Sequence, residues 1–229
     1  SKKEIIKYLG VPEKKIVVMP NGVDLDIYHP DYPEEDIEKC KSKYHIEGEY
    51  FLYLGTLEPR KNLVNLVKAY DLVKKELKDR APKLVLAGGK GWYYDSIFET
   101  VEQLGLREDV IFTGYVPEEE VPLLMNGAKV FVFPSLYEGF GMPPLEAMAC
   151  GTPVIVSNTE ALQETIGNAG ICVDAFDISE FGNKLIELFE NSNLREILSF
   201  NGLTRARQYI WKNMVYKLEV YLKKYEDSI

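Results

Sequence analysis

Short apolar runs alternate with helix-like segments along the chain, and this alternation restricts the possible folds more than any other feature. The runs with the length and the β-branched or aromatic content of buried strands are 15–19, 50–55, 83–87, 110–113, 130–133, 153–157 and 170–173. The segments predicted to be helical are 1–9, 34–44, 63–78, 92–104, 117–125, 143–149, 161–166, 178–190, 194–208 and 213–225. Such an order forms parallel βαβ units. We therefore predict a single α/β domain over residues 1–229, with a doubly wound, mainly parallel sheet and helices on both faces.

The composition restricts the classes of function. The chain has 229 residues and a net charge of −9, which argues against a nucleic-acid partner. No apolar run approaches the ~20 residues of a membrane span, and no signal peptide opens the sequence. Three cysteines in apolar settings are predicted to be buried, reduced thiols of a cytoplasmic protein: Cys40, Cys150 and Cys172. With two histidines and no cluster of metal-binding residues, no metal site is expected.

One segment combines a strand, a glycine loop and the start of a helix. Pro134 ends the apolar run 130–133, because proline cannot donate to a strand ladder. Gly139 and Gly141 follow and allow backbone torsions that other residues avoid. The pair Pro143-Pro144 suits the first turn of a helix, where missing N–H groups are no loss. Free N–H groups and the helix dipole converge at such a junction, so the segment predicts a site for an anion.

Glycine-bearing loops follow several of the predicted strands. They contain Gly55, Gly88 with Gly89, Gly114, and Gly139 with Gly141. In an open α/β sheet, ligands bind beyond the carboxyl ends of the strands, so these loops together predict a cleft at one edge. Arg60 and Lys61 follow one of these strands and would supply positive charge to an anionic ligand, although adjacent basic residues can also be solvated.

Two acids, Glu138 and Glu146, stand with seven residues between them, and alone they could be surface acids of a tight turn. Within EGFGMPPLEAMACGTPVI, however, the pair resembles the motif of the retaining glycosyltransferases of family 4, which have the GT-B architecture of two facing Rossmann-like domains. The resemblance implies the C-terminal, donor-binding half of such an enzyme, either a fragment or a naturally separate half. Residues 1–24 resemble the segment that joins the two domains. The helix in 208–229 would contact the N-terminal domain or simply pack on this one.

The resemblance also implies roles for individual residues. Glu138 matches the catalytic-site glutamate near the transferred sugar, Glu146 the carboxylate that accepts from the ribose hydroxyls, and Lys61 the lysine at the donor diphosphate. Arg60 would replace a family arginine that this chain lacks at position 56. Tyr115 would lie at the nucleobase or be a core aromatic. The other donor-binding positions are Phe140, Gly141 and Met142 at the sugar, Leu145 at the phosphate, Val116 at the nucleobase, and Gly55, Gly88 and Gly139 in the loops.

By this resemblance, the reaction moves a hexose from a nucleotide-diphosphate sugar to a saccharide or lipid-linked acceptor, with retention of anomeric configuration and without a metal or cofactor. The sequence GTLEPRKN at 55–62 resembles a subgroup that contains mannosyltransferases, which favours GDP-mannose as the donor. The acceptor would bind mainly on the N-terminal domain, and a lipid-linked acceptor leaves peripheral membrane attachment open. Alternatively, the chain alone is a nucleotide-sugar binding module without turnover. An NAD-binding enzyme is excluded, because the loop after 50–54 lacks Gly-x-Gly-x-x-Gly.

Overall fold

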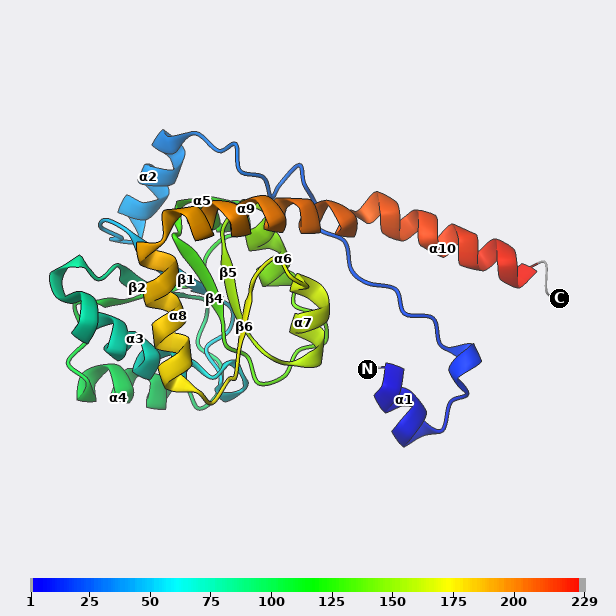
Figure 1. Cartoon of the computed structure of the whole chain (residues 1–229), viewed down its shortest axis with the longest axis horizontal. Helices are drawn as coiled ribbons and strands as arrows, with labels where there is room; N and C mark the ends of the chain where they lie inside the picture. The colour runs from blue at the N-terminus through cyan, green and yellow to red at the C-terminus, as the bar shows by residue number, and fades with distance from the viewer. Residues whose placement is uncertain (1, 227–229) are drawn as a thin grey trace.

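The computed structural model describes residues 2–226, with side chains described for residues 2–223. At its centre lies a sheet of six parallel strands in the order β3-β2-β1-β4-β5-β6. The strands are β1 (Tyr50–Leu54), β2 (Lys83–Ala87), β3 (Val110–Gly114), β4 (Val130–Phe133), β5 (Val154–Ser157) and β6 (Ile171–Val173). This order is the doubly wound arrangement, and the predicted α/β fold is confirmed (Figure 1).

Helices cover both faces of the sheet (Figure 1). On one face, α8 (Ile178–Glu190) and α4 (Asp95–Gln103) pack on α3 (Leu63–Leu77). On the other face, α9 (Ser192–Ala206) packs on α6 (Met142–Ala149), and α2 (Glu34–Lys43) packs on α5 (Val121–Gly127). The remaining helices are α1 (Lys2–Leu9), α7 (Glu160–Ile166) and α10 (Trp211–Glu226).

The core lies along the central strands, because helices shield them from both sides. Residues Tyr50 to Tyr53 of β1 are fully buried, as are all four residues of β4 and the three apolar residues of β5. The buried hydroxyl of Tyr50 donates to the carbonyl of Leu124 at 2.7 Å, which satisfies its polar atom. Edge strands β3 and β6 are only partly covered. The apolar runs therefore position the loops that follow β1, β2 and β4 on a rigid base.

The strand predicted over 15–19 is wrong. Residues Glu13–Lys15 form a 3₁₀ turn, and the residues after it are extended but pair with no strand of the described chain. Val17 and Val18 remain 49% and 51% exposed. A β-strand needs a neighbouring strand to satisfy its backbone, and the apolar pattern alone does not supply one. The nearest pairing is an isolated bridge between Val23 and Ile210.

Several helix boundaries also differ from the prediction. The helix predicted from Pro117 begins at Val121, since residues 118–120 form a turn and Pro122 occupies the first turn of α5. The helix predicted from Trp92 begins at Asp95, after a loop in which Tyr93 has a φ of +52°. Cys40 and Cys150 are buried as predicted, and Cys172 is only half-buried, because it lies on the edge strand β6.

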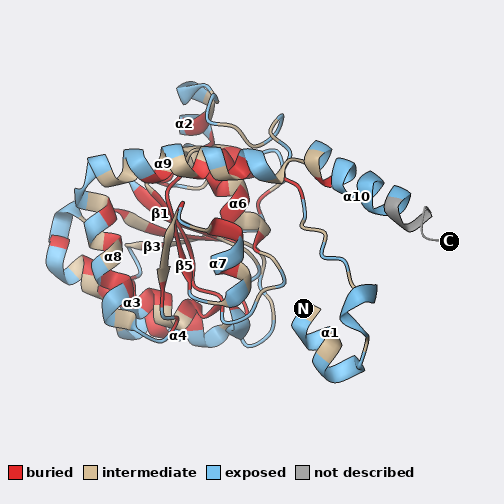
Figure 2. Cartoon of the chain, turned by 45° about the vertical axis from the view of Figure 1, so that its right-hand side comes forward, coloured by how far each residue is buried: buried red, intermediate tan, exposed pale blue. Residues whose placement is uncertain are grey.

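The two terminal segments cross where they leave the domain and then diverge (Figure 1). The N–H of Val23 donates to the carbonyl of Tyr209 at 2.6 Å, and a Cβ on Gly22 would lie 2.7 Å from Trp211. Beyond this crossing, α1 has no buried residue, and α10 projects from the domain with an exposed surface (Figure 2). The predicted contact of the helix in 208–229 includes residues 227–229, which lie outside the described residues. Within 2–226, no helix is both long and apolar enough to cross a bilayer.

Candidate functional site

The loops after β1 and β4 meet at the carboxyl edge of the sheet. The N–H of Leu136 donates to the carbonyl of Arg60 at 2.9 Å and joins the two loops directly. Because β1 and β4 are neighbours, residues 77 positions apart in the chain come into contact here. The predicted convergence of the glycine loops at one edge is therefore present for these two.

An ion cluster occupies this junction. Lys61 Nζ lies 2.6 Å from Glu138 Oε1, and Arg60 Nη1 lies 3.1 Å from the same oxygen. The Lys61 side chain is only 10% exposed and its ammonium also sits 4.8 Å from the centre of the Phe133 ring. Arg60 Nη2 lies 2.6 Å from Glu58 Oε1. Sequence interpretation missed Glu58, which is 6% exposed and carries no motif of its own.

Four successive N–H groups of the loop before α6 make no hydrogen bond within the described part of the chain. The N–H groups of Gly139, Phe140, Gly141 and Met142 have no hydrogen-bond partner in the described part of the chain. Pro143 and Pro144 have no N–H, and the two prolines lie in the first turn of α6 as predicted. These free donors lie where the helix dipole is positive, so the loop can bind oxygen atoms of a ligand.

Leu145 is placed differently from the donor role implied for it. Its side chain is fully buried, and its N–H donates to the carbonyl of Gly141 at 3.4 Å within α6. Gly141 has a φ of +109°, and a Cβ there would lie 2.6 Å from Leu162. The sharp entry to α6 therefore requires glycine and leaves Met142 as the helix residue with a free donor.

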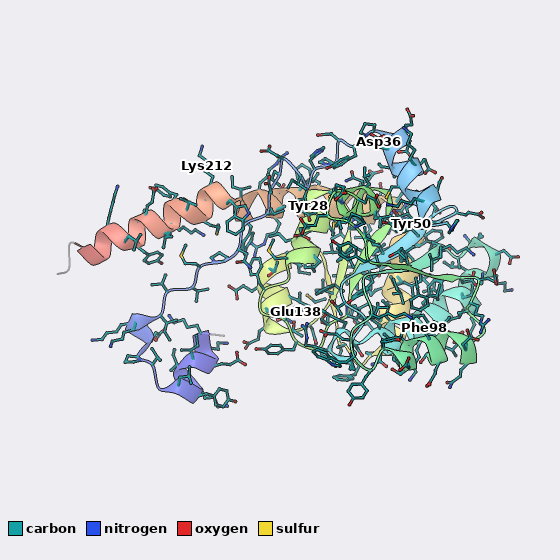
Figure 3. The ribbon with its side chains drawn as sticks, turned by 180° about the vertical axis from the view of Figure 1, so that it is seen from behind. Tyr28, Asp36, Tyr50, Phe98, Glu138 and Lys212 are labelled. Atoms are coloured by element: carbon teal, nitrogen blue, oxygen red, sulfur yellow. The ribbon has the colours of Figure 1, made fainter. Side chains whose placement is uncertain are left out.

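A cavity of about 290 Å³ lies beside Glu138. It is lined by Lys3, Glu4, Tyr137, Glu138, Gly139, Thr159, Glu160, Ala161 and Glu164. Figure 3 shows Glu138 at the side of the domain that faces the N-terminal segment. Thr159 Oγ1 and Ser135 Oγ are buried without a hydrogen-bond partner in the described chain. Of these two residues, Thr159 lines the same cavity as Glu138, so its hydroxyl is a group that a polyhydroxylated ligand in this cavity can satisfy.

Glu146 lies one helical turn beyond Met142 on α6. Burial raises the pKa of its carboxyl to about 7, and the negative charge of Glu118 contributes to the rise. The Glu146 carboxyl has no hydrogen-bond partner among the described residues, although the backbone carbonyl of Glu146 accepts from the N–H of Cys150 at 3.0 Å. Its charge also contributes to the raised pKa of Tyr28, so the segment before α2 lies near it. A partly buried acid without partners is available to accept hydrogen bonds from a ligand.

The stability of the unliganded protein should depend on the charge of Glu146. Because the pKa in the folded state lies near 7 and the ordinary value is 4.5, ionisation of Glu146 destabilises the fold as the pH rises through this window. Glu146→Gln should therefore stabilise the protein by about 2–3 kcal/mol at pH 8 and by less than about 1 kcal/mol near pH 5. Chemical unfolding at both pH values measures this, with the exposed Glu99→Gln on α4 as control. An equal effect at both pH values would contradict the assignment.

Of the two residues predicted to lie at the nucleobase, one is exposed and the other is buried. Tyr115 is 75% exposed and is therefore not a core aromatic, whereas Val116 is buried at 6%. The same loop carries Glu118, whose charge acts on Glu146. The loop after β3 therefore lies near α6, and the exposed ring of Tyr115 is accessible to a ligand.

The predicted glycines after β1 and β2 serve close packing of the strand ends. Gly88 has a φ of +141°, and a Cβ there would lie 2.1 Å from the carbonyl oxygen of Gly55. The N–H of Gly88 donates to the carbonyl of Gly114 at 2.9 Å. Any side chain at position 88 would push these loops apart, so glycine is required by the backbone itself.

The comparisons with known proteins identify the family. A family model described as "Glycosyl transferases group 1" matches residues 36–205. The chain belongs to this family. Over 215 residues it is 40% identical to O-antigen chain mannosyltransferase B of Escherichia coli, covering 93% of this chain and 55% of that protein. Over 211 residues it is 33% identical to a serotype-specific mannosyltransferase of Escherichia coli, covering 92% of this chain and 26% of that protein. The chain thus spans about half of the length of the first relative and about a quarter of the length of the second.

Solved glycosyltransferase structures have the same fold. The chain resembles an Anabaena protein crystallised with UDP and glucose, with a TM-score of 0.87 and 21% identity over 98% of this chain and 61% of that chain. It also resembles the C-terminal domain of a glycosyl transferase group 1 family protein from Francisella tularensis. That match has a TM-score of 0.71 and 26% identity, over 82% of this chain and 97% of that chain. The Rossmann-like architecture of the domain is therefore shared with members of the family.

Proposed function

We propose that this chain is the donor-binding domain of a retaining, metal-independent mannosyltransferase that uses GDP-mannose. The observation that carries the proposal is the junction of Lys61 and Glu138 with four unpaired N–H groups at the start of α6. A nucleotide-diphosphate sugar presents an anion beside a ring of hydroxyl groups. The junction offers a cation, free donors and a carboxylate to these groups.

Each part of the donor has a proposed partner. Lys61 neutralises the diphosphate, and the free donors from Gly139 to Met142 hold phosphate and sugar oxygens. Glu138 accepts from a sugar hydroxyl within the cavity of about 290 Å³. Glu146 accepts from the ribose hydroxyls, which its unpaired carboxylate supports. Tyr115 and Val116 lie at the nucleobase.

The proposed chemistry breaks the bond between the anomeric carbon of the sugar and the diphosphate oxygen. The bonding electrons leave with the diphosphate, whose growing negative charge Lys61 and the α6 N–H groups stabilise. The acceptor oxygen attacks the anomeric carbon from the same face and loses its proton, so the configuration is retained. Glu138 orients and stabilises the sugar during the transfer. Within residues 2–226, no group of three or more potential metal ligands lies together, and metal independence stays a prediction.

The choice of sugar and acceptor rests on the relatives. Two of them are named as mannosyltransferases, and one of these as an enzyme of the O-antigen chain. We therefore propose mannose as the transferred sugar and a saccharide or a lipid-linked saccharide as the acceptor. Attachment to the inner face of a membrane through a lipid-linked acceptor is part of this proposal. As an isolated domain, the chain would bind the nucleotide sugar without turnover.

The acceptor site is proposed to lie on a second domain of the complete protein. The matched relatives extend well beyond the region that this chain covers. The terminal segments carry apolar side chains that the domain does not cover, including Val17, Val18 and, on α10, Trp211 at 53% and Leu222 at 54% exposure. We propose that residues 1–24 join the two domains and that 208–226 contact the second one. An exposed apolar surface of this kind is typical of an interface.

Binding of GDP, UDP and ADP, each with and without EDTA, tests the proposal. Calorimetry with the 229-residue chain should give at least about tenfold tighter binding of GDP than of the other two, because a pocket built to pair with one base leaves unpaired groups with another. EDTA should not change the affinity. Binding of none of the three, or binding that EDTA abolishes, would contradict a metal-free GDP-sugar site on this domain. Mannosyl transfer by the isolated chain would contradict its description as a binding module.

A further inference from the structure

One arginine side chain joins the loops after β1 and β4. Arg60 Nη1 donates to the carbonyl of Tyr137 at 2.8 Å and to Glu138 Oε1 at 3.1 Å. Its Nη2 donates to Glu58 Oε1 at 2.6 Å. The guanidinium is therefore held at both ends, by an acid of its own loop and by two oxygens of the opposite loop. Because the guanidinium is planar and its N–H donors have fixed directions, it sets both the distance and the angle between the two loops that it joins.

Glu58 is itself fixed by its surroundings. The N–H of the preceding Leu57 donates to the carbonyl of Gly89 at 2.9 Å, and the N–H of Gly91 donates back to the carbonyl of Leu57 at 3.0 Å. The N–H of Lys61 donates to the carbonyl of Glu58 at 3.0 Å. The Glu58 side chain is only 8% exposed, and Arg60 is its ion-pair partner in the described chain. A buried carboxylate with one cationic partner strongly favours a single position of that partner.

We propose that Glu58 and Arg60 form a positioning clamp for the Glu138 loop. Glu58 orients Arg60, and Arg60 holds Tyr137 and Glu138 in place instead of binding the diphosphate, which is left to Lys61. The clamp rests on the proposed function, because it assigns the two residues to the same sugar-transfer site. Neither residue touches the donor in this arrangement, so both are positioning residues.

The unpaired backbone N–H groups of the loop after Glu138 make the position of this loop depend on contacts such as the clamp. The N–H groups from Gly139 to Met142 follow Glu138 directly, and within the described residues none of them has a protein partner that would hold it. The position of the loop therefore depends on its other anchors. They are Arg60 on the Tyr137 carbonyl, the Leu136 N–H on the Arg60 carbonyl, Lys61 on Glu138, and the Thr165 hydroxyl on the Phe140 carbonyl. A shift of ~1 Å at such a site can cost about 10²-fold in rate.

Three variants test the clamp: Glu58→Gln, Arg60→Met and the double variant. In the complete enzyme, each should lower kcat about 10- to 100-fold with KM changed less than about threefold. The double variant should be no worse than Arg60→Met alone, because the two residues act as one unit. Arg80→Met is the matched control. Arg80 forms an ion pair with Glu190 at 3.0 Å away from this edge, and its loss should leave kcat unchanged.

Amide hydrogen exchange of Leu136 in the 229-residue chain tests the clamp independently of activity. Loss of the Arg60 anchor should speed exchange of this amide about tenfold in Glu58→Gln and Arg60→Met, but not in Arg80→Met. Unchanged exchange in Glu58→Gln would overturn the clamp even if the chain binds no nucleotide. Additive losses of kcat in the double variant would also overturn the clamp, because they would show that the two residues act independently. GDP binding that is weakened more than tenfold by Arg60→Met but not by Glu58→Gln would overturn it as well, and would make Arg60 a phosphate ligand.

Discussion

Replacing Lys61 with alanine is expected to weaken GDP binding about 10²-fold and guanosine binding less than about threefold. Only 10% of the Lys61 side chain is exposed, so in the proposed site its hydrogen bonds to phosphate oxygens would be shielded from water. Guanosine has no phosphate and does not use this cation. Calorimetry with both ligands measures the difference.

Lys68→Ala is the control for this experiment, because it removes an exposed lysine from the nearby helix α3. Chemical unfolding of the Lys61→Ala variant establishes that the domain stays folded, and Arg60 remains within 3.1 Å of Glu138 to balance its charge. Equal losses for GDP and guanosine would remove Lys61 from the diphosphate site. They would point to a general disturbance of the loop.

Replacing Glu138 with glutamine is expected to lower kcat of the complete enzyme about 10²- to 10³-fold without weakening GDP binding. The amide keeps the shape of the side chain but removes the negative charge that is proposed to face the sugar. In the unliganded domain, Glu138 Oε1 also neutralises Lys61 at 2.6 Å and Arg60 at 3.1 Å. Losing that charge leaves the two cations more positive, so the affinity for the GDP diphosphate should not fall.

Steady-state kinetics in the complete enzyme and calorimetry on the chain separate these two effects. Glu187→Gln is a matched control, because Glu187 is also an ion-paired acid, 2.8 Å from Lys184, but lies on α8. A variant of Glu138 that keeps full kcat would contradict its role at the sugar. A parallel fall in GDP affinity would mean that the carboxylate organises the phosphate site instead.

The wrongly predicted strand at 15–19 and the missed residue Glu58 illustrate two different limits of sequence interpretation. The run from Lys15 to Met19 has the local pattern of a strand, but strand formation depends on a partner elsewhere in space, and the described chain offers none. Glu58 looks like any loop acid in the sequence. The available signal was its position two residues before a candidate arginine, and burial by the loop after β2 is what makes it significant.

The helix bounds show the same division. Pro143 and Pro144 correctly predicted the first turn of α6, because proline fixes φ and lacks an N–H wherever it occurs. By the same reasoning Pro117 predicts a helix start, but Pro122 lies in the first turn of α5 instead. Where two nearby prolines could each begin a helix, the local sequence does not show which of them does.

The parallel α/β fold and the loops at the strand ends could be predicted from the amino-acid sequence, and the resemblance of their motif to a known family identified the candidate acids Glu138 and Glu146. Hydrophobic periodicity, glycine torsions and proline geometry act over a few residues, so they can be recognised along the chain. Only the tertiary structure decided that Lys61 meets Glu138, that Arg60 joins Glu58 to the opposite loop, and that burial raises the pKa of Glu146. These properties depend on distances between residues far apart in the sequence and on the exclusion of water, which arise only when the sheet assembles.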